Sequence, residues 1–152
     1  MEKESELNRR IAEDLKQAMK SGDTGKRDTL RMLLSSVKYA EIAKQAPVTD
    51  GDIIGVIVKE VKRHQESIDA FKHGNRPDLT AKEEAEMAVL KSYLPQQATL
   101  EEIIAAARQV IAEVGAVGPG DKGKVMQRLV PLLKGKADGK EINDVVTGLL
   151  KT

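Results

Sequence analysis

The sequence has no cysteine and no tryptophan, and it has only one phenylalanine and two tyrosines among 152 residues. Without cysteine there is no disulfide framework, no thiolate zinc site and no cysteine nucleophile. The scarcity of aromatic residues also argues against the stacking platforms that hold unpaired bases. The core must therefore be built from Leu, Ile, Val, Ala and Met. Any RNA partner would be recognised by its backbone and folded shape.

Long apolar segments are also missing. No apolar run approaches the ~18 residues that a membrane-spanning helix needs, and the first residues alternate in charge where a secretory signal would be apolar. The sequence thus predicts a cytoplasmic protein with no membrane partner. Since the net charge is only +1, affinity for nucleic acid would have to come from a local basic patch.

The residues that usually carry catalysis or bind cofactors are sparse. Neither G-x-x-x-x-G-K-[ST] nor G-x-G-x-x-G occurs, so no nucleotide cofactor is predicted. His64 and His73 are nine residues apart, which places them on opposite sides of one helix, where surface or capping roles are expected. The pairs Glu83–Glu84 and Glu101–Glu102 fall in helical first turns, where they complement the helix dipole. Ser35–Ser36 has no evident base nearby. We therefore predict no catalytic residue, no metal site, no cofactor and no enzymatic activity.

Apolar residues recur at helical spacing almost throughout the chain, and no period-2 strand pattern is convincing. The prediction is an all-α fold. About four helices form an N-terminal helical bundle over residues 1–94, and a small three-helix unit follows over residues 95–152. Pro95, directly after Tyr93-Leu94, marks the boundary.

Capping signals set the expected helix limits in the first 94 residues. The first helix starts near Ser5 and ends at Gly22, and the second starts at Asp23 or Thr24 and stops before Pro47. The third helix starts with the capping-box pattern of Thr49 and Asp52 and reaches about Lys72, and the fourth opens at Pro77 and reaches about Lys91. The buried side of the second helix is expected to hold Leu30, Leu33, Leu34, Val37 and Ile42.

Three shorter helices are expected after Pro95. Polar caps precede each apolar stripe: Thr99 with Glu102, then Asp121, then Asp138 with Glu141. Pro131 is expected to bend the last turn of the middle helix because it removes a backbone hydrogen bond.

The connection between the last two helices carries lysines and glycines. From Gly120 onward there are seven basic residues and four acids, a local charge of +3. Free amides at a helix start favour an anion, and glycines let a phosphate approach the backbone. The same pattern is also typical of solvated lysines beside a glycine-rich helix end. The basic residues are Lys122, Lys124, Arg128, Lys134, Lys136, Lys140 and Lys151.

Two further basic clusters lie in the first half of the chain. One comprises Lys59, Lys62 and Arg63 with His64 on the expected third helix, and the other comprises Lys26, Arg27, Arg31 and Lys38 on the second. Both patterns are typical of solvated helix faces.

Three segments carry a family resemblance: Arg31–Lys38, Tyr93–Gln97 and Gly123–Asn143, with K-G-K-A-D-G-x-x-I-N at Lys134–Asn143 as the most specific element. Over essentially its whole length the chain resembles the GatB/YqeY family and looks closest to the stand-alone bacterial YqeY type. That family includes the helical tail domain of the B subunit of glutamine-dependent aspartyl/glutamyl-tRNA amidotransferase. The tail contacts tRNA and performs no chemistry.

The resemblance implies an all-helical, non-catalytic tRNA-binding accessory protein, acting beside a tRNA-modifying enzyme or an aminoacyl-tRNA synthetase. Two alternatives remain open: a helical protein–protein interaction adaptor, and, remotely, a C–N ligase of the amidotransferase type. Under the leading hypothesis, Lys134, Lys136 and Lys140 hold phosphates, and Lys122, Lys124 and Arg128 widen the contact. Gly135 and Gly139 let the protein backbone approach the phosphates. Asn143 hydrogen-bonds either a 2′-hydroxyl of the RNA or the loop itself.

Overall fold

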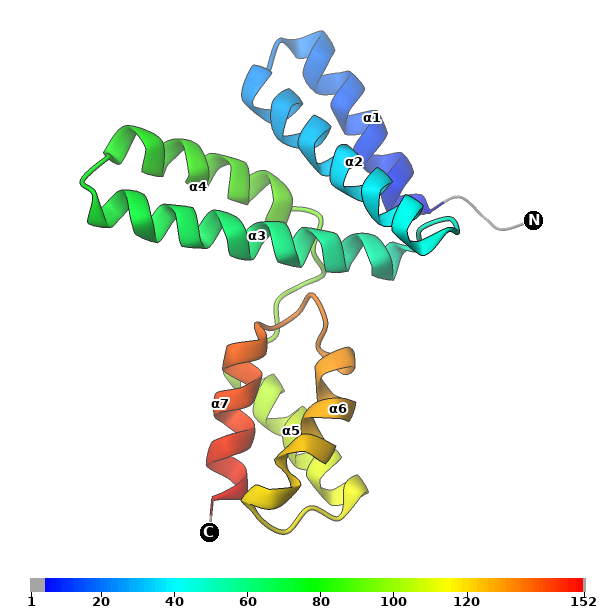
Figure 1. The fold of residues 1–152 in the computed structure, drawn as a ribbon, viewed down its shortest axis with the longest axis vertical. Helices are drawn as coiled ribbons and strands as arrows, with labels where there is room; N and C mark the ends of the chain where they lie inside the picture. Colours follow the sequence, from blue (N-terminus) through cyan, green and yellow to red (C-terminus); the bar gives the residue numbers. More distant parts are fainter. Residues whose placement is uncertain (1–4, 152) are drawn as a thin grey trace. The chain divides into compact units, whose positions relative to one another are not determined.

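The computed structural model describes residues 5–151, and these residues form seven α-helices, one short 3-10 helix and no strand (Figure 1). The predicted all-α fold is confirmed. The chain divides into two compact units, one ending at Leu94 and the other beginning at Pro95. Each unit has its own apolar core.

The N-terminal unit consists of two helical hairpins (Figure 1). The first pairs α1 (Glu6–Ser21) with α2 (Thr24–Lys44), and the second pairs α3 (Asp50–His73) with α4 (Pro77–Lys91). Their amphipathic faces meet in one core. Its buried members are Leu7, Ile11, Leu30, Leu33, Val37, Val48, Ile53, Ile57, Leu90 and Tyr93.

Ile42 was predicted to belong to this core, and that prediction is wrong, because its side chain is 63% exposed. The buried stripe of α2 runs through Leu33 and Val37. At 100° per residue Ile42 lies about 140° around the helix from Val37, and the half-buried Ala40 continues the stripe instead.

The helix starts of the N-terminal unit follow the capping residues. The Ser5 side chain accepts a hydrogen bond from the Asn8 amide, and Asp23 accepts one from the Lys26 amide. Thr49 and Asp52 form both halves of the predicted capping box at α3. Pro77 occupies the first position of α4, where its missing N–H costs no hydrogen bond.

The C-terminal unit packs α5 (Leu100–Val114), the short 3-10 helix η1 (Pro119–Asp121), α6 (Lys122–Leu132) and α7 (Gly139–Leu150) around a second core. Aliphatic residues three and four apart face inward on each of the three α-helices. The buried members are Ile103, Ala107, Val110, Val125, Leu129, Leu133, Ile142, Val146 and Leu150.

Helix ends in this unit differ in part from the prediction. Of the capping box expected at α5 one half is present, since Thr99 accepts from the Glu102 amide. Asp121 does not cap α6: its carboxylate accepts from the Val117 amide at 3.0 Å, and η1 leads directly into the helix. Asp138 accepts from the Lys140 amide, two residues on, so the expected box with Glu141 does not form. Pro131 lies in the last turn of α6, and the helix ends one residue later.

Candidate functional site

The lysine loop, residues 134–140, connects α6 to the first turn of α7. Its three lysines, Lys134, Lys136 and Lys140, are exposed, whereas Gly135 between them is buried. Gly135 has φ +78, a left-handed conformation that costs side chains about 1–2 kcal/mol. The chain reverses tightly after α6, because the amides of Lys136 and Ala137 both donate to the Leu133 carbonyl at 2.9 and 3.1 Å.

The segment before α5 fixes the backbone of the lysine loop. The side-chain amide of Gln97 donates to the Gly135 carbonyl at 2.7 Å, and the Ala98 amide donates to the Lys136 carbonyl at 2.8 Å. Gln97 ends the Tyr93–Gln97 segment noted in the sequence. The structure therefore joins two of the three segments on which the family resemblance rests, and it holds the loop in one backbone conformation.

The start of α7 is less open to an anion than the sequence suggested. The Asp138 carboxylate is the N-cap and accepts from the Lys140 amide at 3.4 Å. A negative side chain at this position already complements the helix dipole. A phosphate at the lysine loop would be held chiefly by the ammonium groups of Lys134, Lys136 and Lys140. Gly139 is exposed at the first position of α7, and Asn143 is half-buried one turn after Lys140.

The other three predicted contact residues lie along α6, and the structure does not bring all nine into one cluster. Lys122 begins the helix and the lysine loop follows its far end, a helix length of about 16 Å. Lys124 and Arg128 line a shallow hollow on this helix together with Val114 and Gln127. The six residues Lys134, Gly135, Lys136, Gly139, Lys140 and Asn143 form one group, and Lys122, Lys124 and Arg128 form a second.

Acidic neighbours reduce the positive charge of the second group. Lys124 Nζ lies 3.7 Å from Asp121 Oδ1, and Arg128 Nη2 lies 3.6 Å from Glu113 Oε2. The hydrogen bond from the Val117 amide, followed by the charge of Lys124, lowers the pKa of Asp121. Asp121 thus remains anionic at neutral pH and competes with a phosphate for Lys124, which makes the lysine loop the stronger candidate.

Tyr93, the first residue of the Tyr93–Gln97 segment, has a structural role, because it contacts α1 within the N-terminal unit. Its hydroxyl donates to Asp14 Oδ2 at 2.6 Å, and the Arg10 guanidinium lies 4.9 Å from the centre of its ring. Burial, and then the hydrogen bond to Asp14, raise the pKa of the Tyr93 hydroxyl. This side chain attaches the end of α4 to α1 and is not available to stack on a base.

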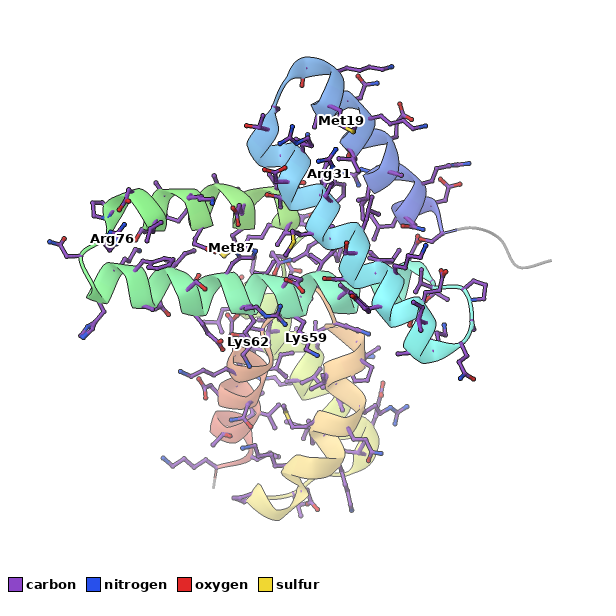
Figure 2. The ribbon with its side chains drawn as sticks, turned by 45° about the horizontal axis from the view of Figure 1, so that its top comes forward. Met19, Arg31, Lys59, Lys62, Arg76 and Met87 are labelled. Atoms are coloured by element: carbon purple, nitrogen blue, oxygen red, sulfur yellow. The ribbon has the colours of Figure 1, made fainter. Side chains whose placement is uncertain are left out.

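In the two basic clusters of the N-terminal unit, some side chains are exposed and others are paired with acidic residues. Lys59 and Lys62 are exposed on the side of α3 that faces away from α4 (Figure 2). Arg63 is paired with Glu60 at 3.5 Å. On α2, Arg27 Nε lies 2.9 Å from the neighbouring Asp28 carboxylate. Each of these clusters therefore has an acidic neighbour that reduces its positive charge.

His64 does not take the surface or capping role that the sequence suggested. Its side chain is only 18% exposed, and it lies between α3 and α4, where Nδ1 hydrogen-bonds Glu83 Oε2 and lies 3.7 Å from Glu86 Oε2. His73, in contrast, is exposed at the last position of α3. The partners of His64 come from the next helix, so spacing along α3 alone did not reveal them.

Within the described residues, 5–151, no helix is long and apolar enough to cross a membrane.

Comparison with known proteins places these features in a family context. A family model described as Yqey-like protein matches residues 8–150. An uncharacterised protein of Schizosaccharomyces pombe is 33% identical over 89 residues, which cover 59% of this chain and 72% of that protein. Proteins named "Altered inheritance of mitochondria protein 41, mitochondrial" also match. The protein of that name from Pyrenophora tritici-repentis is 28% identical, and the match covers 87% of this chain and 74% of that protein. The one from Eremothecium gossypii is 34% identical, and the match covers 68% of this chain and 58% of that protein.

Proposed function

The chain belongs to the Yqey-like family, and we propose that it is a non-catalytic tRNA-binding accessory protein whose lysine loop holds RNA phosphates. The observation that carries this proposal is the anchored loop itself. Three exposed lysines lie within seven residues, on a backbone fixed by hydrogen bonds from Gln97 and Ala98. The resemblance to the tail domain of the tRNA amidotransferase B subunit supports tRNA as the class of RNA.

The physical basis of the proposed binding is electrostatic. Lysine ammonium groups that neutralise phosphates release condensed counterions, which makes affinity depend steeply on salt but hardly on base sequence. Because the backbone of the loop is already fixed, less conformational entropy is lost on binding than for a free lysine-rich segment. Lys124 and Arg128 would extend the contact along α6.

The proposed partners follow from this role. We expect tRNA to be bound together with a tRNA-modifying enzyme or an aminoacyl-tRNA synthetase, without a small-molecule cofactor. The proposed location is the cytoplasm. The relatives whose names include "mitochondrial" make the mitochondrion the alternative location.

Charge reversal on the lysine loop tests the proposal. In Lys134→Glu/Lys136→Glu, both substituted side chains are exposed, so folding should be preserved while two phosphate contacts become repulsive. We expect at least about tenfold weaker binding of fluorescently labelled bulk tRNA, and a salt slope (log affinity against log salt) about two units shallower. Fluorescence polarisation at several salt concentrations measures both quantities.

A matched control distinguishes the effect of the lysine loop on affinity from the effect of net charge. Lys16→Glu/Lys20→Glu makes the same change of net charge at two exposed lysines of α1. Its effect on affinity should be much smaller than that of the loop variant. Equal losses in the two double variants would remove the lysine loop from the proposal, and unchanged affinity in the loop variant would contradict it directly.

The adaptor alternative is favoured by one specific feature of α2. Met32, Tyr39 and Ile42 are 70%, 75% and 63% exposed, and an exposed group of large apolar side chains is typical of protein contact surfaces. On the C-terminal unit, Val117 and Leu132 are exposed as well. Recovery of one defined protein after nuclease treatment, lost in Tyr39→Glu, would support this function, and recovery of RNA alone would count against it.

A further inference from the structure

We propose that His64, Glu83 and Glu86 form a binding site for one divalent transition-metal ion of the zinc type. Within residues 5–151 they are the one group of histidine and acidic side chains whose ligand atoms converge, with all three atoms within 4.8 Å of one another. The site lies wholly inside the N-terminal unit. It is independent of the proposed RNA contact on the lysine loop.

The helices bring the three side chains together by their spacing. Glu83 and Glu86 are three residues apart on α4 and therefore share one face. Met87, the residue after Glu86, points into the space between α3 and α4 (Figure 2). His64 meets this face from the antiparallel helix α3. Because the ligands come from two packed helices, their relative placement is set before an ion arrives, which lowers the cost of binding.

Acidic side chains outnumber the single imidazole in this group. Two carboxylates approach one imidazole nitrogen, and the side chains of His64, Glu83 and Glu86 are only 18%, 21% and 26% exposed. A neutral imidazole can donate its Nδ1 proton to only one of them. Glu60, 18% exposed, adds a third carboxylate nearby and is partly offset by Arg63 at 3.5 Å. Carboxylates that are largely withdrawn from water are favoured by a nearby positive charge, and a divalent ion would supply one.

The donor atoms select the class of metal. One imidazole nitrogen with two carboxylate oxygens suits Zn²⁺, whereas Mg²⁺ prefers oxygen ligands and retained waters. At a metal–ligand distance of about 2.1 Å, two ligands of one ion lie up to about 4.2 Å apart, and Nδ1 of His64 is 3.7 Å from Glu86 Oε2. An ion bound to Nδ1 replaces the hydrogen bond to Glu83, with the imidazole proton on Nε2.

The site also has an entry path and room for a further ligand. A cavity of about 110 Å³ adjoins it, lined by His64 and Glu86 together with Asp28, Thr29 and Glu60 among others. Three protein ligands leave a fourth position open, and water can reach that position from the cavity. The ion would join α3 to α4 and keep an exchangeable ligand facing α2.

Isothermal titration of the chelator-treated full chain with Zn²⁺, in the presence of millimolar Mg²⁺, tests the site. We expect one ion per chain, and at least about tenfold weaker binding in His64→Ala and in Glu83→Gln. The chain supplies matched controls: His73→Ala removes its other histidine, and Glu84→Gln removes the neighbouring carboxylate, which is 50% exposed and near Lys72. Both controls should bind Zn²⁺ like the unmodified chain.

Absence of stoichiometric Zn²⁺ binding, or binding by the controls as weak as by the site variants, would overturn the proposal. The isosteric Glu83→Gln keeps the test valid if His64→Ala fails to fold, and circular dichroism of the zinc-free variant checks its helix content. Because the chain has two histidines, NMR adds a direct readout. One equivalent of Zn²⁺ should shift the imidazole signals of His64 and leave those of His73 in place, and a shift of His73 alone would contradict the assignment.

Discussion

The Gln97 side chain is one of the groups that fix the conformation of the lysine loop. Its amide donates to the Gly135 carbonyl at 2.7 Å, while the same group lies 3.1 Å from the Pro95 carbonyl within its own segment. Gly135 is buried with φ +78, and carbonyls of buried residues are generally hydrogen-bonded. The neighbouring lysines then project from a fixed backbone.

Gln97→Ala should therefore weaken both stability and RNA binding. Loss of this hydrogen bond is expected to cost about 0.5–1.5 kcal/mol of unfolding free energy, because Gln97 is exposed and water can replace its side chain, and the loosened loop should bind tRNA less tightly. Urea unfolding and fluorescence polarisation measure the two effects. The adjacent, exposed Gln96 provides the control, because Gln96→Ala should change neither quantity, and equal effects of the two substitutions would disprove the anchoring role.

At the scale of helices, the polar N-cap residues indicate the helix starts most clearly in the sequence. Helix starts were expected near Ser5, at Asp23 or Thr24, at Thr49 and at Thr99, and the side chains of Ser5, Asp23, Thr49 and Thr99 each accept an amide of the first turn. Such caps depend on neighbours within three residues and so can be read locally. Asp121 differs, since the preceding turn brings the Val117 amide to its carboxylate and a 3-10 helix forms first.

Asp52, in the first turn of α3, makes the free energy of unfolding depend on pH in the acid range. The hydrogen bond from Lys44 at 2.6 Å, followed by that from the Thr49 amide at 2.9 Å, lowers the pKa of Asp52 from 3.8 to about 2. A depressed carboxyl pKa stabilises the fold above the unfolded-state value, and that contribution is lost as pH falls from about 4 through about 2. At neutral pH it is fully present.

Asp52→Asn should remove this dependence. The free energy of unfolding of the unmodified chain should exceed that of the variant near neutral pH, and the difference should shrink as pH falls from about 4 to about 2. Urea unfolding at a series of pH values measures it. Asp69→Asn, which removes the same charge from an exposed position later in α3, controls for net charge, and a difference independent of pH would contradict the assignment.

At the scale of the whole molecule, contacts between helices limit what the sequence could predict. The all-α fold followed from apolar spacing, which is a property of each helix taken alone. The pairing of His64 with Glu83 and Glu86, and of Gln97 with Gly135, depends on which helix faces touch. The division of the nine predicted contact residues into two groups has the same origin, because α6 separates Lys122 from Lys134 by its full length.

The two cores have no buried residue in common, so each unit should have its own stability. Ile57→Ala and Ile142→Ala each empty a fully buried position, in the first and second core respectively, with an expected cost of about 2–5 kcal/mol. Native-state hydrogen exchange should show lost protection only up to Leu94 for Ile57→Ala, and only from Pro95 onward for Ile142→Ala. Equal loss in both units for either variant would refute independent cores.

The central claim, that the lysine loop makes this chain a tRNA-binding protein, is tested most directly by titrating the unmodified chain with labelled bulk tRNA at several salt concentrations. Three to six lysine and arginine contacts predict micromolar or tighter binding at low salt, with a slope of log affinity against log salt of about −2 to −5. No binding at low salt, or affinity that does not change with salt, would contradict the claim.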